Sequence, residues 1–166
     1  MCPSPSPFFS IYASYFPSNN INMSEVPSYV FPVAATANGI FAGLGLTINF
    51  VTVPALRAAG YPVAGWAVTY KNGAKLAVST ILISSAMHFY KYYLTKETRS
   101  FYCGVASLFS APFTIICMSS TNNRLHALNA DPSHDKRQVV QLVEKWNKLQ
   151  YARTIAGVVA LGLTLF

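Results

Sequence analysis

The sequence predicts an all-α fold: a four-helix transmembrane bundle with an amphipathic interfacial helix before the last span. The first observation is composition, since 52% of the 166 residues are hydrophobic and only 10% are charged, whereas an ordinary soluble domain carries about 25% charged residues. The second is that uncharged runs separate the charges, each close to the length of about 20 residues that a helix needs to cross the hydrocarbon core. The chain is too short for two ordinary domains, so we expect one membrane domain.

Residues 1–32 precede this domain and differ from it in composition. They are rich in proline, serine, asparagine and aromatic residues, and Glu25 is their only charged side chain. We expect a tail that is disordered or lies at the membrane interface. The four-span membrane domain is then expected over residues 33–166.

The first span is expected over residues 33–56, which contain no charged side chain. Small residues recur at every fourth position, and this spacing allows helix backbones to approach closely in lipid. They are Ala35, Gly39 and Gly43, and a second stripe of the same helix consists of Asn38, Ala42, Gly45 and Asn49. Asn49 is interpreted either as a hydrogen-bonding partner between helices or as a pocket residue.

The second span is expected over residues 75–94, after a connection that runs from Arg57 to Ala74. Glycine and proline residues favour a loop there, and Trp66 and Tyr70 are typical of an interfacial aromatic belt. His88 lies within the second span. A histidine at membrane depth indicates a functional residue, and a position close to the helix end equally favours an interfacial one.

The third span is expected over residues 101–123, with a kink at Pro112, because proline removes one backbone hydrogen bond of a helix. The fourth is expected over residues 148–166 and follows an amphipathic helix, KRQVVQLVEKWNKLQYART. Only 13 residues follow Arg153, and their length of about 20 Å is shorter than a hydrocarbon core of about 30 Å. The last span is therefore expected to start near Lys148 and to carry Arg153 into the bundle.

Basic residues predict the orientation of the bundle. Those on the side of the first and third connections are Arg57, Lys71, Lys75, Arg124, Lys136, Arg137, Lys145, Lys148 and Arg153, and those on the other side are Lys91, Lys96 and Arg99. The richer side is expected to be cytosolic and the N-terminus lumenal, in a protein integral to the endoplasmic reticulum membrane. A glycosylation sequon at Asn22 would report this topology. Contact with anionic lipid headgroups explains the net charge of +7 better than nucleic acid, which is not expected as a partner.

Polar residues are expected to converge at the cytosolic end of the bundle. Two guanidinium groups, Arg124 and Arg153, flanked by amides, are suited to stabilising a phenolate, enolate or carboxylate. His126 and Tyr151 are the candidate general bases, and His126 is preferred because the pKa of a histidine is near neutrality. The alternative interpretation of the two arginines is topology and headgroup binding. No cysteine or histidine spacing typical of a zinc or haem site is present, so no metal is predicted.

Three stretches carry a resemblance to a known family: the glycine-rich first span ending in Pro54, the stretch PFTIICMSSTNNRL, and WNKLQYAR. Over roughly residues 33–166 the chain resembles the anthrone oxygenase family, small four-span membrane proteins that include fungal enzymes of polyketide secondary metabolite biosynthesis. The resemblance implies an oxidoreductase, a monooxygenase that converts an anthrone to an anthraquinone. Molecular oxygen would be the co-substrate, with no metal, flavin or other cofactor.

The resemblance also implies roles for individual residues. The catalytic set would be His126 as base, Arg124 and Arg153 as anion clamp, and Asn122 and Asn123 as orienting donors. The substrate-binding set would be Asn49, Thr121, Trp146 as a stacking wall, Tyr151 and His88. The partners would be the lipid bilayer and a small lipophilic aromatic substrate, with homo-oligomerisation left open. Two alternative functions remain: a non-oxidative isomerase or cyclase of a lipophilic pathway intermediate, and a non-catalytic membrane scaffold or lipid-binding subunit.

Overall fold

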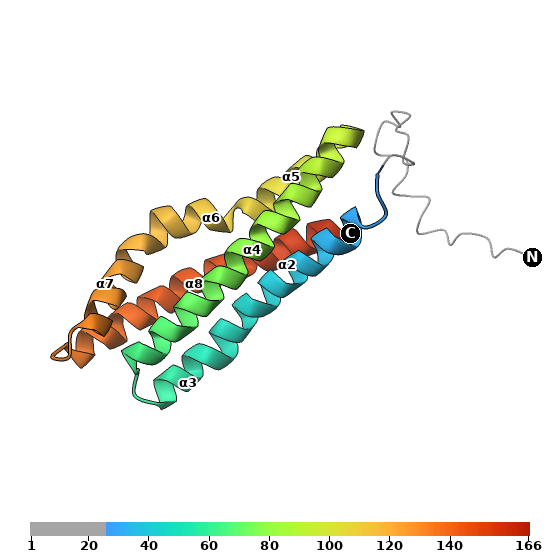
Figure 1. Cartoon of the computed structure of the whole chain (residues 1–166). Coiled ribbons are helices and arrows are strands. Elements are labelled where there is room, and N and C mark those ends of the chain that lie inside the picture. Colours follow the sequence, from blue (N-terminus) through green and yellow to red (C-terminus); the bar gives the residue numbers. More distant parts are fainter. Residues whose placement is uncertain (1–25) are drawn as a thin grey trace, which may run out of the picture.

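The computed structural model describes residues 26–166, and in these residues it shows four long antiparallel helical stretches (Figure 1). The elements are α2 (Val30–Thr47), η2 (Ile48–Thr52), α3 (Val53–Ala58), α4 (Val63–Thr95), α5 (Thr98–Leu108), α6 (Ser110–Phe113), η3 (Thr114–Met118), α7 (Ser119–Ala130) and α8 (Lys136–Leu165). The predicted all-α class is confirmed. The predictions for the Asn22 sequon and for most of the tail concern residues outside the described part of the chain.

The first stretch, α2 to α3, is one helix with a widened turn in its middle. The wide turn η2 ends two residues before Pro54, whose ring would clash with the carbonyl of Phe50 in a regular α-helix. A π-turn relieves this conflict and rotates the residues around it. One of them is Asn49, which is buried against α8.

The second stretch, α4, begins at Val63 and is 33 residues long. The predicted connection from Arg57 to Ala74 is therefore wrong beyond Pro62, because the helix already runs through this region. The turn itself is only a few residues long, and it is made by left-handed backbone at Gly60 (φ 76°) and Tyr61 (φ 59°). Trp66 consequently lies on a helix and is fully buried, not in an interfacial belt.

The third stretch bends at the predicted place. The helix α5 ends at Leu108, and Pro112 lies in the short α6, followed by the wide turn η3. The Thr114 hydroxyl donates to the Ser110 carbonyl at 2.7 Å, so a side chain stabilises the distorted backbone. Figure 1 shows α6 bowing away from α8 before α7 returns toward it.

The fourth stretch, α8, is a single helix of 30 residues. The predicted amphipathic helix and the predicted last span are thus continuous, with no break near Lys148. The helix starts where the Asp135 carboxylate accepts a hydrogen bond from the Arg137 backbone N–H at 2.9 Å, a regular N-cap. Continuity fixes the side-chain directions on both halves of α8 relative to each other.

Helices α2 and α8 approach closely along the second of the two predicted stripes. A Cβ atom on Gly45 would lie 2.7 Å from Thr154 Oγ1, whereas one on Gly39 or Gly43 would meet nothing within 4 Å. The glycines of the other predicted stripe, Gly39 and Gly43, thus make no close approach to a neighbouring helix among the described residues. The buried face instead passes through Asn38, Ala42 and Gly45, because the helical repeat of 3.6 residues turns these positions toward α8.

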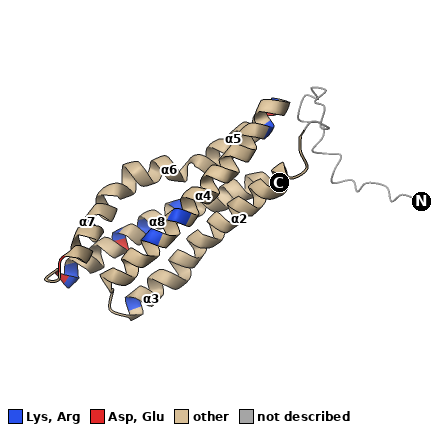
Figure 2. Cartoon of the chain, viewed as in Figure 1, with Lys and Arg blue, Asp and Glu red and all other residues tan. Residues whose placement is uncertain are grey.

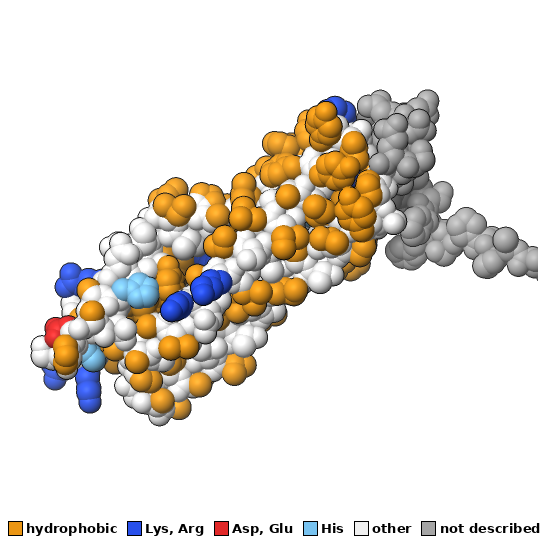
Figure 3. Space-filling model, viewed as in Figure 1, with side chains coloured by type: hydrophobic (Ala, Val, Ile, Leu, Met, Phe, Trp, Pro, Cys, Tyr) orange, Lys and Arg blue, Asp and Glu red, His pale blue; other side chains and the backbone are white. Residues whose placement is uncertain are grey.

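Two of the four stretches, Val30–Ala58 and Thr98–Ala130, are long and apolar enough to cross a membrane, each with a mean hydropathy of 1.7. Lysines and arginines gather at the end formed by α3 and the turn between α7 and α8, and along the adjoining α4 and α8 (Figure 2). Apolar side chains cover much of the opposite half of the surface (Figure 3). They are exposed on all four stretches, as at Phe50, Leu82, Ile116 and Ile155.

Replacing Gly45 with alanine is expected to destabilise the bundle by roughly 1–3 kcal/mol, because the new methyl group would push α2 away from Thr154 on α8. The matched control is Gly43→Ala on the same helix, which has free space and gains helix propensity. Thermal unfolding of the purified variants in detergent, followed by circular dichroism, measures both effects. Equal losses of stability in the two variants would contradict the packing assigned to Gly45.

Candidate functional site

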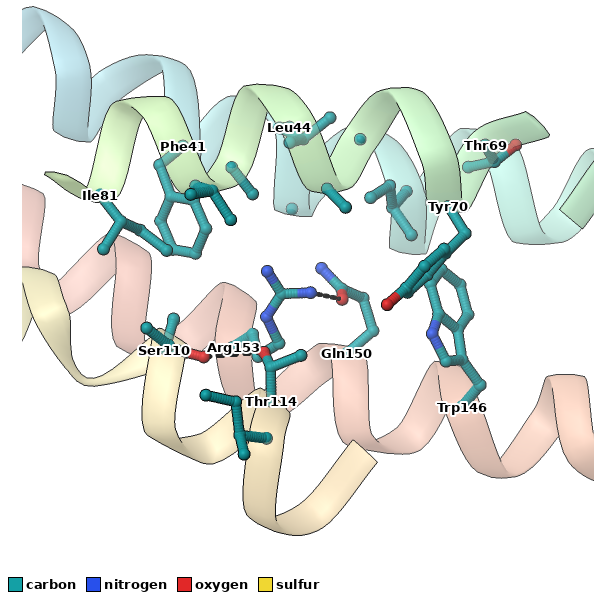
Figure 4. Close-up of a pocket in the computed structure, with 18 residues that line it drawn as sticks. Phe41, Leu44, Thr69, Tyr70, Ile81, Ser110, Thr114, Trp146, Gln150 and Arg153 are labelled. Atoms are coloured by element: carbon teal, nitrogen blue, oxygen red, sulfur yellow. Dashed lines mark hydrogen bonds between the residues drawn. The ribbon is translucent and has the colours of Figure 1, made fainter. Parts of the chain in front are cut away.

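A cavity of about 190 Å³, here called the central cavity, lies between α2, α4, α8 and the bent third stretch (Figure 4). It adjoins two groups of buried apolar side chains, one around Trp66 and Trp146 and the other made of Phe41, Ala77 and Ile81. Most of its wall is apolar, and the polar lining residues are Thr69, Tyr70, Ser110, Thr114, Gln150 and Arg153. Val78 and Ile115 line it as well and are exposed, so the cavity opens to the apolar surface between α4 and η3.

Helix α8 contributes three cavity residues at helical spacing: Trp146, Gln150 and Arg153. The Nη1 of Arg153 donates to Gln150 Oε1 at 2.9 Å. Its Cζ lies 5.8 Å from the centroid of the Phe41 ring, within range of a cation–π interaction. The guanidinium is therefore held in place from two sides and directed into the cavity, as Figure 4 shows.

Arg153 has no acidic partner in the described part of the chain. The ion pairs within residues 26–166 are Arg57–Glu144 and Lys91–Glu97, and the Nε of Arg153 is buried without a hydrogen-bond acceptor there. Arg153 as a whole is half-buried, and a guanidinium even partly removed from water without a carboxylate partner is unfavourable. An anion bound in the cavity would compensate it, and the fork of N–H groups suits a planar oxyanion.

Tyr70 and Trp146 form an aromatic wall of the cavity. The Tyr70 ring stacks on Trp66, with centroids 5.2 Å apart and an interplanar angle of 23°, and Trp66 meets Trp146 edge to face at 6.0 Å. The indole Nε1 of Trp146 is buried with no acceptor among the described residues. On the side of α7, Asn122 Nδ2 donates to the Tyr70 hydroxyl at 3.4 Å.

The polar residues Thr121 to Arg124 of α7 face two different directions. Thr121 and Asn122 are buried, whereas Asn123 and Arg124 are exposed, because successive residues of an α-helix point about 100° apart. With its amide oxygen turned toward Arg124, Gln138 on α8 accepts hydrogen bonds from Nη2 at 2.7 Å and from Nε at 3.2 Å. The structure thus does not bring Arg124 and Arg153 into one cavity.

His126 is not among the residues that line the central cavity. Its exposed imidazole packs on Tyr70 and Trp66, with ring centroids 4.9 and 5.0 Å apart. It lines a second cavity of about 560 Å³, here called the outer cavity, together with Lys71 and Asn129. The catalytic role predicted for His126 stays a prediction.

Asn49 and Tyr151, predicted to bind substrate, do not line the central cavity. The Asn49 amide donates to Asn147 Oδ1 at 2.9 Å and accepts from the Thr154 hydroxyl, so both of its groups are used in joining η2 to α8. The Tyr151 ring lies against Phe50 on the outer face of α8, with the centroids 6.0 Å apart. Their predicted roles in substrate binding are untested.

His88 lies at the opposite end of the bundle. Its Nε2 is 3.0 Å from the Thr164 hydroxyl, and it lines a separate pocket of about 180 Å³ with Lys91, Glu97 and Arg99. This pocket shares no lining residue with the central cavity. The role in substrate binding predicted for His88 therefore has no support from its position, and it stays untested.

Of the residues that line the cavity, only Trp146 and Arg153 were predicted as site residues. The missed polar ones include Tyr70 and Gln150. Gln150 lies four positions after Trp146 and three before Arg153, so helical spacing alone could have indicated it. Tyr70 could not be placed, because the start of α4 was predicted too late. Within residues 26–166, no three His, Cys, Asp or Glu side chains are grouped closely enough to hold a metal ion.

Comparison with known proteins gives a consistent result. The chain is 28% identical to anthrone oxygenase dmxR16 of Cryptosporiopsis sp. (strain 8999) over 140 residues, which are 79% of this chain and 82% of that protein. It is 27% identical to anthrone oxygenase gedH of Aspergillus terreus (strain NIH 2624 / FGSC A1156) over 141 residues, 80% of this chain and 94% of that protein. No solved structure matches the chain.

The family model for anthrone oxygenase matches residues 66–163. This range includes every residue that α4, the third stretch and α8 contribute to the central cavity. More than half of the chain is matched, and the chain therefore belongs to the anthrone oxygenase family, a family of enzymes.

Proposed function

We propose that the protein is a four-span integral membrane oxygenase that oxidises an anthrone, or a related polycyclic phenol, to an anthraquinone with molecular oxygen. It would act in polyketide secondary metabolism, without a metal or an organic cofactor. Membership of the family and the similarity to two fungal anthrone oxygenases support this proposal. The observation that carries it is the guanidinium of Arg153, which enters a largely apolar cavity with no acidic partner among the described residues.

The chemistry of an anthrone fits such a site. Loss of a proton from the central methylene to water gives a delocalised anion whose charge rests largely on the ring oxygen. Arg153 would stabilise this oxygen, and Trp146 and Phe41 would contact the flat rings. The anion passes an electron to oxygen and combines with it to give a peroxide anion. This anion takes a proton back from water to become a hydroperoxide, which loses water to form the second carbonyl. The balance is anthrone and dioxygen to anthraquinone and water.

A membrane placement would give a lipophilic substrate access to the cavity. In a four-span arrangement, the opening between Val78 and Ile115 would face lipid, and an apolar ligand dissolved in the bilayer could enter there without crossing water. The basic end formed by α3 and the turn between α7 and α8 (Figure 2) would lie at the cytosolic surface of the endoplasmic reticulum.

Replacing Arg153 with methionine is expected to lower turnover of an anthrone by at least about 100-fold, because one strong donor to the developing oxyanion is lost. The matched control is Arg137→Met, an exposed arginine at the start of the same helix. The assay is oxygen uptake and product mass in microsomes that contain the full-length protein, with and without a chelator, which should have no effect. Wild-type uptake no faster than that of empty microsomes would refute the oxygenase. A product with the mass of the substrate would indicate an isomerase or cyclase.

Replacing Arg124 with methionine tests the predicted two-arginine clamp. Because Arg124 is exposed and faces Gln138, we expect turnover to change by no more than about twofold, as for an ordinary surface substitution. The same microsomal assay measures it. A loss as large as that of Arg153→Met would mean that Arg124 reaches the substrate after all.

Glycosylation of Asn22 tests the orientation. With a lumenal N-terminus, microsomal protein should carry a glycan that a glycosidase removes and that Asn22→Gln abolishes. A sequon introduced into the turn at residues 131–135 should stay unmodified. Modification of that turn, with Asn22 unmodified, would reverse the proposed topology.

A further inference from the structure

We propose that Tyr70 is a further catalytic residue of this site, the proton donor that allows the substrate hydroperoxide to lose water. This inference rests on the proposed function, since it concerns the second half of the same reaction. No proton donor in the central cavity was predicted from the sequence, and this inference gives that role to Tyr70.

The position of Tyr70 is fixed by three neighbours. Its ring is stacked on Trp66 at 5.2 Å, and the His126 imidazole packs against it at 4.9 Å. Asn122 holds the hydroxyl from the side of α7. In Figure 4 the hydroxyl points into the central cavity toward Gln150, the residue that binds Arg153. A phenol restrained in this way can act on a ligand held by Arg153.

The hydrogen bond from Asn122 determines where the phenol proton is available. Because Asn122 Nδ2 donates at 3.4 Å, the Tyr70 oxygen is the acceptor in that bond. Within residues 26–166 the Tyr70 hydroxyl makes no other hydrogen bond, so its proton is free for a ligand. Among the described residues that line the cavity, only Tyr70 and Arg153 have ionisable side chains. An arginine does not release its proton in proteins, and Tyr70 is therefore the acid.

The proposed step balances in atoms and electrons. At the hydroperoxide, the C–H electron pair forms the new carbonyl bond while the O–O bond breaks. The departing hydroxide takes the Tyr70 proton and leaves as water. The proton released from carbon passes through water to the Tyr70 phenolate, which restores the phenol. Tyr70 and Arg153 line the same cavity, so the positive charge of Arg153 would stabilise the transient phenolate.

Tyr70 is also placed for exchange of protons with solvent. It lines both the central cavity and the outer cavity of about 560 Å³. The outer cavity contains the exposed side chains of Lys71, His126 and Asn129. Water in the outer cavity therefore reaches one side of the residue, while the substrate would occupy the other.

The test is Tyr70→Phe in the full-length membrane protein, which keeps the stacked ring and removes only the hydroxyl. The control is Tyr93→Phe, an exposed tyrosine of the same helix α4. An anthrone is mixed with an excess of protein, quenched with acid, and analysed by mass. We expect Tyr70→Phe to consume oxygen and anthrone but to form anthraquinone roughly 100-fold more slowly. The adduct of one anthrone with one whole dioxygen molecule should accumulate, and Tyr93→Phe should behave as wild type.

The other outcomes separate this inference from the function on which it rests. Wild-type anthraquinone formation by Tyr70→Phe, without the adduct, overturns the role of Tyr70 and leaves the oxygenase intact. Loss of oxygen uptake in Tyr70→Phe also overturns it, because the residue would then act before oxygen adds. Absence of oxygen uptake in the wild-type protein refutes the proposed function itself.

Discussion

The Arg153 guanidinium, directed into the bundle without a carboxylate partner among the described residues, is the constraint on which the site depends. Arg153 is half-buried, and a charge partly removed from water is unfavourable unless it is paired or neutralised. An arginine cannot be neutralised by losing its proton. Gln150 and the face of Phe41 supply only a dipole and a ring quadrupole. Under the proposed function, Arg153 would bind the substrate as an anion, and the apolar wall around it would favour an anion that is itself largely apolar.

The fold provides both the rigidity and the space for this site. Asn49, Asn147 and Thr154 join α2 to α8 through buried hydrogen bonds, and Gly45 lets the two backbones approach. The third stretch does not approach α8 closely along its whole length, because the distortion around Pro112 moves α6 away from α8 (Figure 1). The close contact between α2 and α8 fixes the side of the cavity that carries Arg153. The bend of the third stretch leaves the opposite side open to the apolar surface.

The sequence predicted the features that follow from hydrophobicity and chain length. The all-α class, the bend at Pro112 and the inward direction of Arg153 came from uncharged runs, a proline and the short distance to the C-terminus. The residues around the cavity were harder to predict, because they depend on helix phase. Four adjacent polar residues look like one cluster in a sequence, yet the helix buries Thr121 and Asn122 and exposes Asn123 and Arg124. Tyr70 was missed for a related reason, because glycines in the first part of α4 suggested a loop. One of them, Gly65, is in fact helical and packs against Leu56 of α3.

The central claim, that Arg153 binds the substrate as an anion, can be measured without any turnover. The purified protein is titrated with an anthrone in the absence of oxygen, and the absorbance of the deprotonated anthrone is followed against pH. If the account is right, the bound anthrone ionises at a clearly lower pH than the free compound, and Arg153→Met restores the value of the free compound while still binding it. Ionisation of the bound anthrone at the same pH as in solution, or a shift that survives in Arg153→Met, would contradict it.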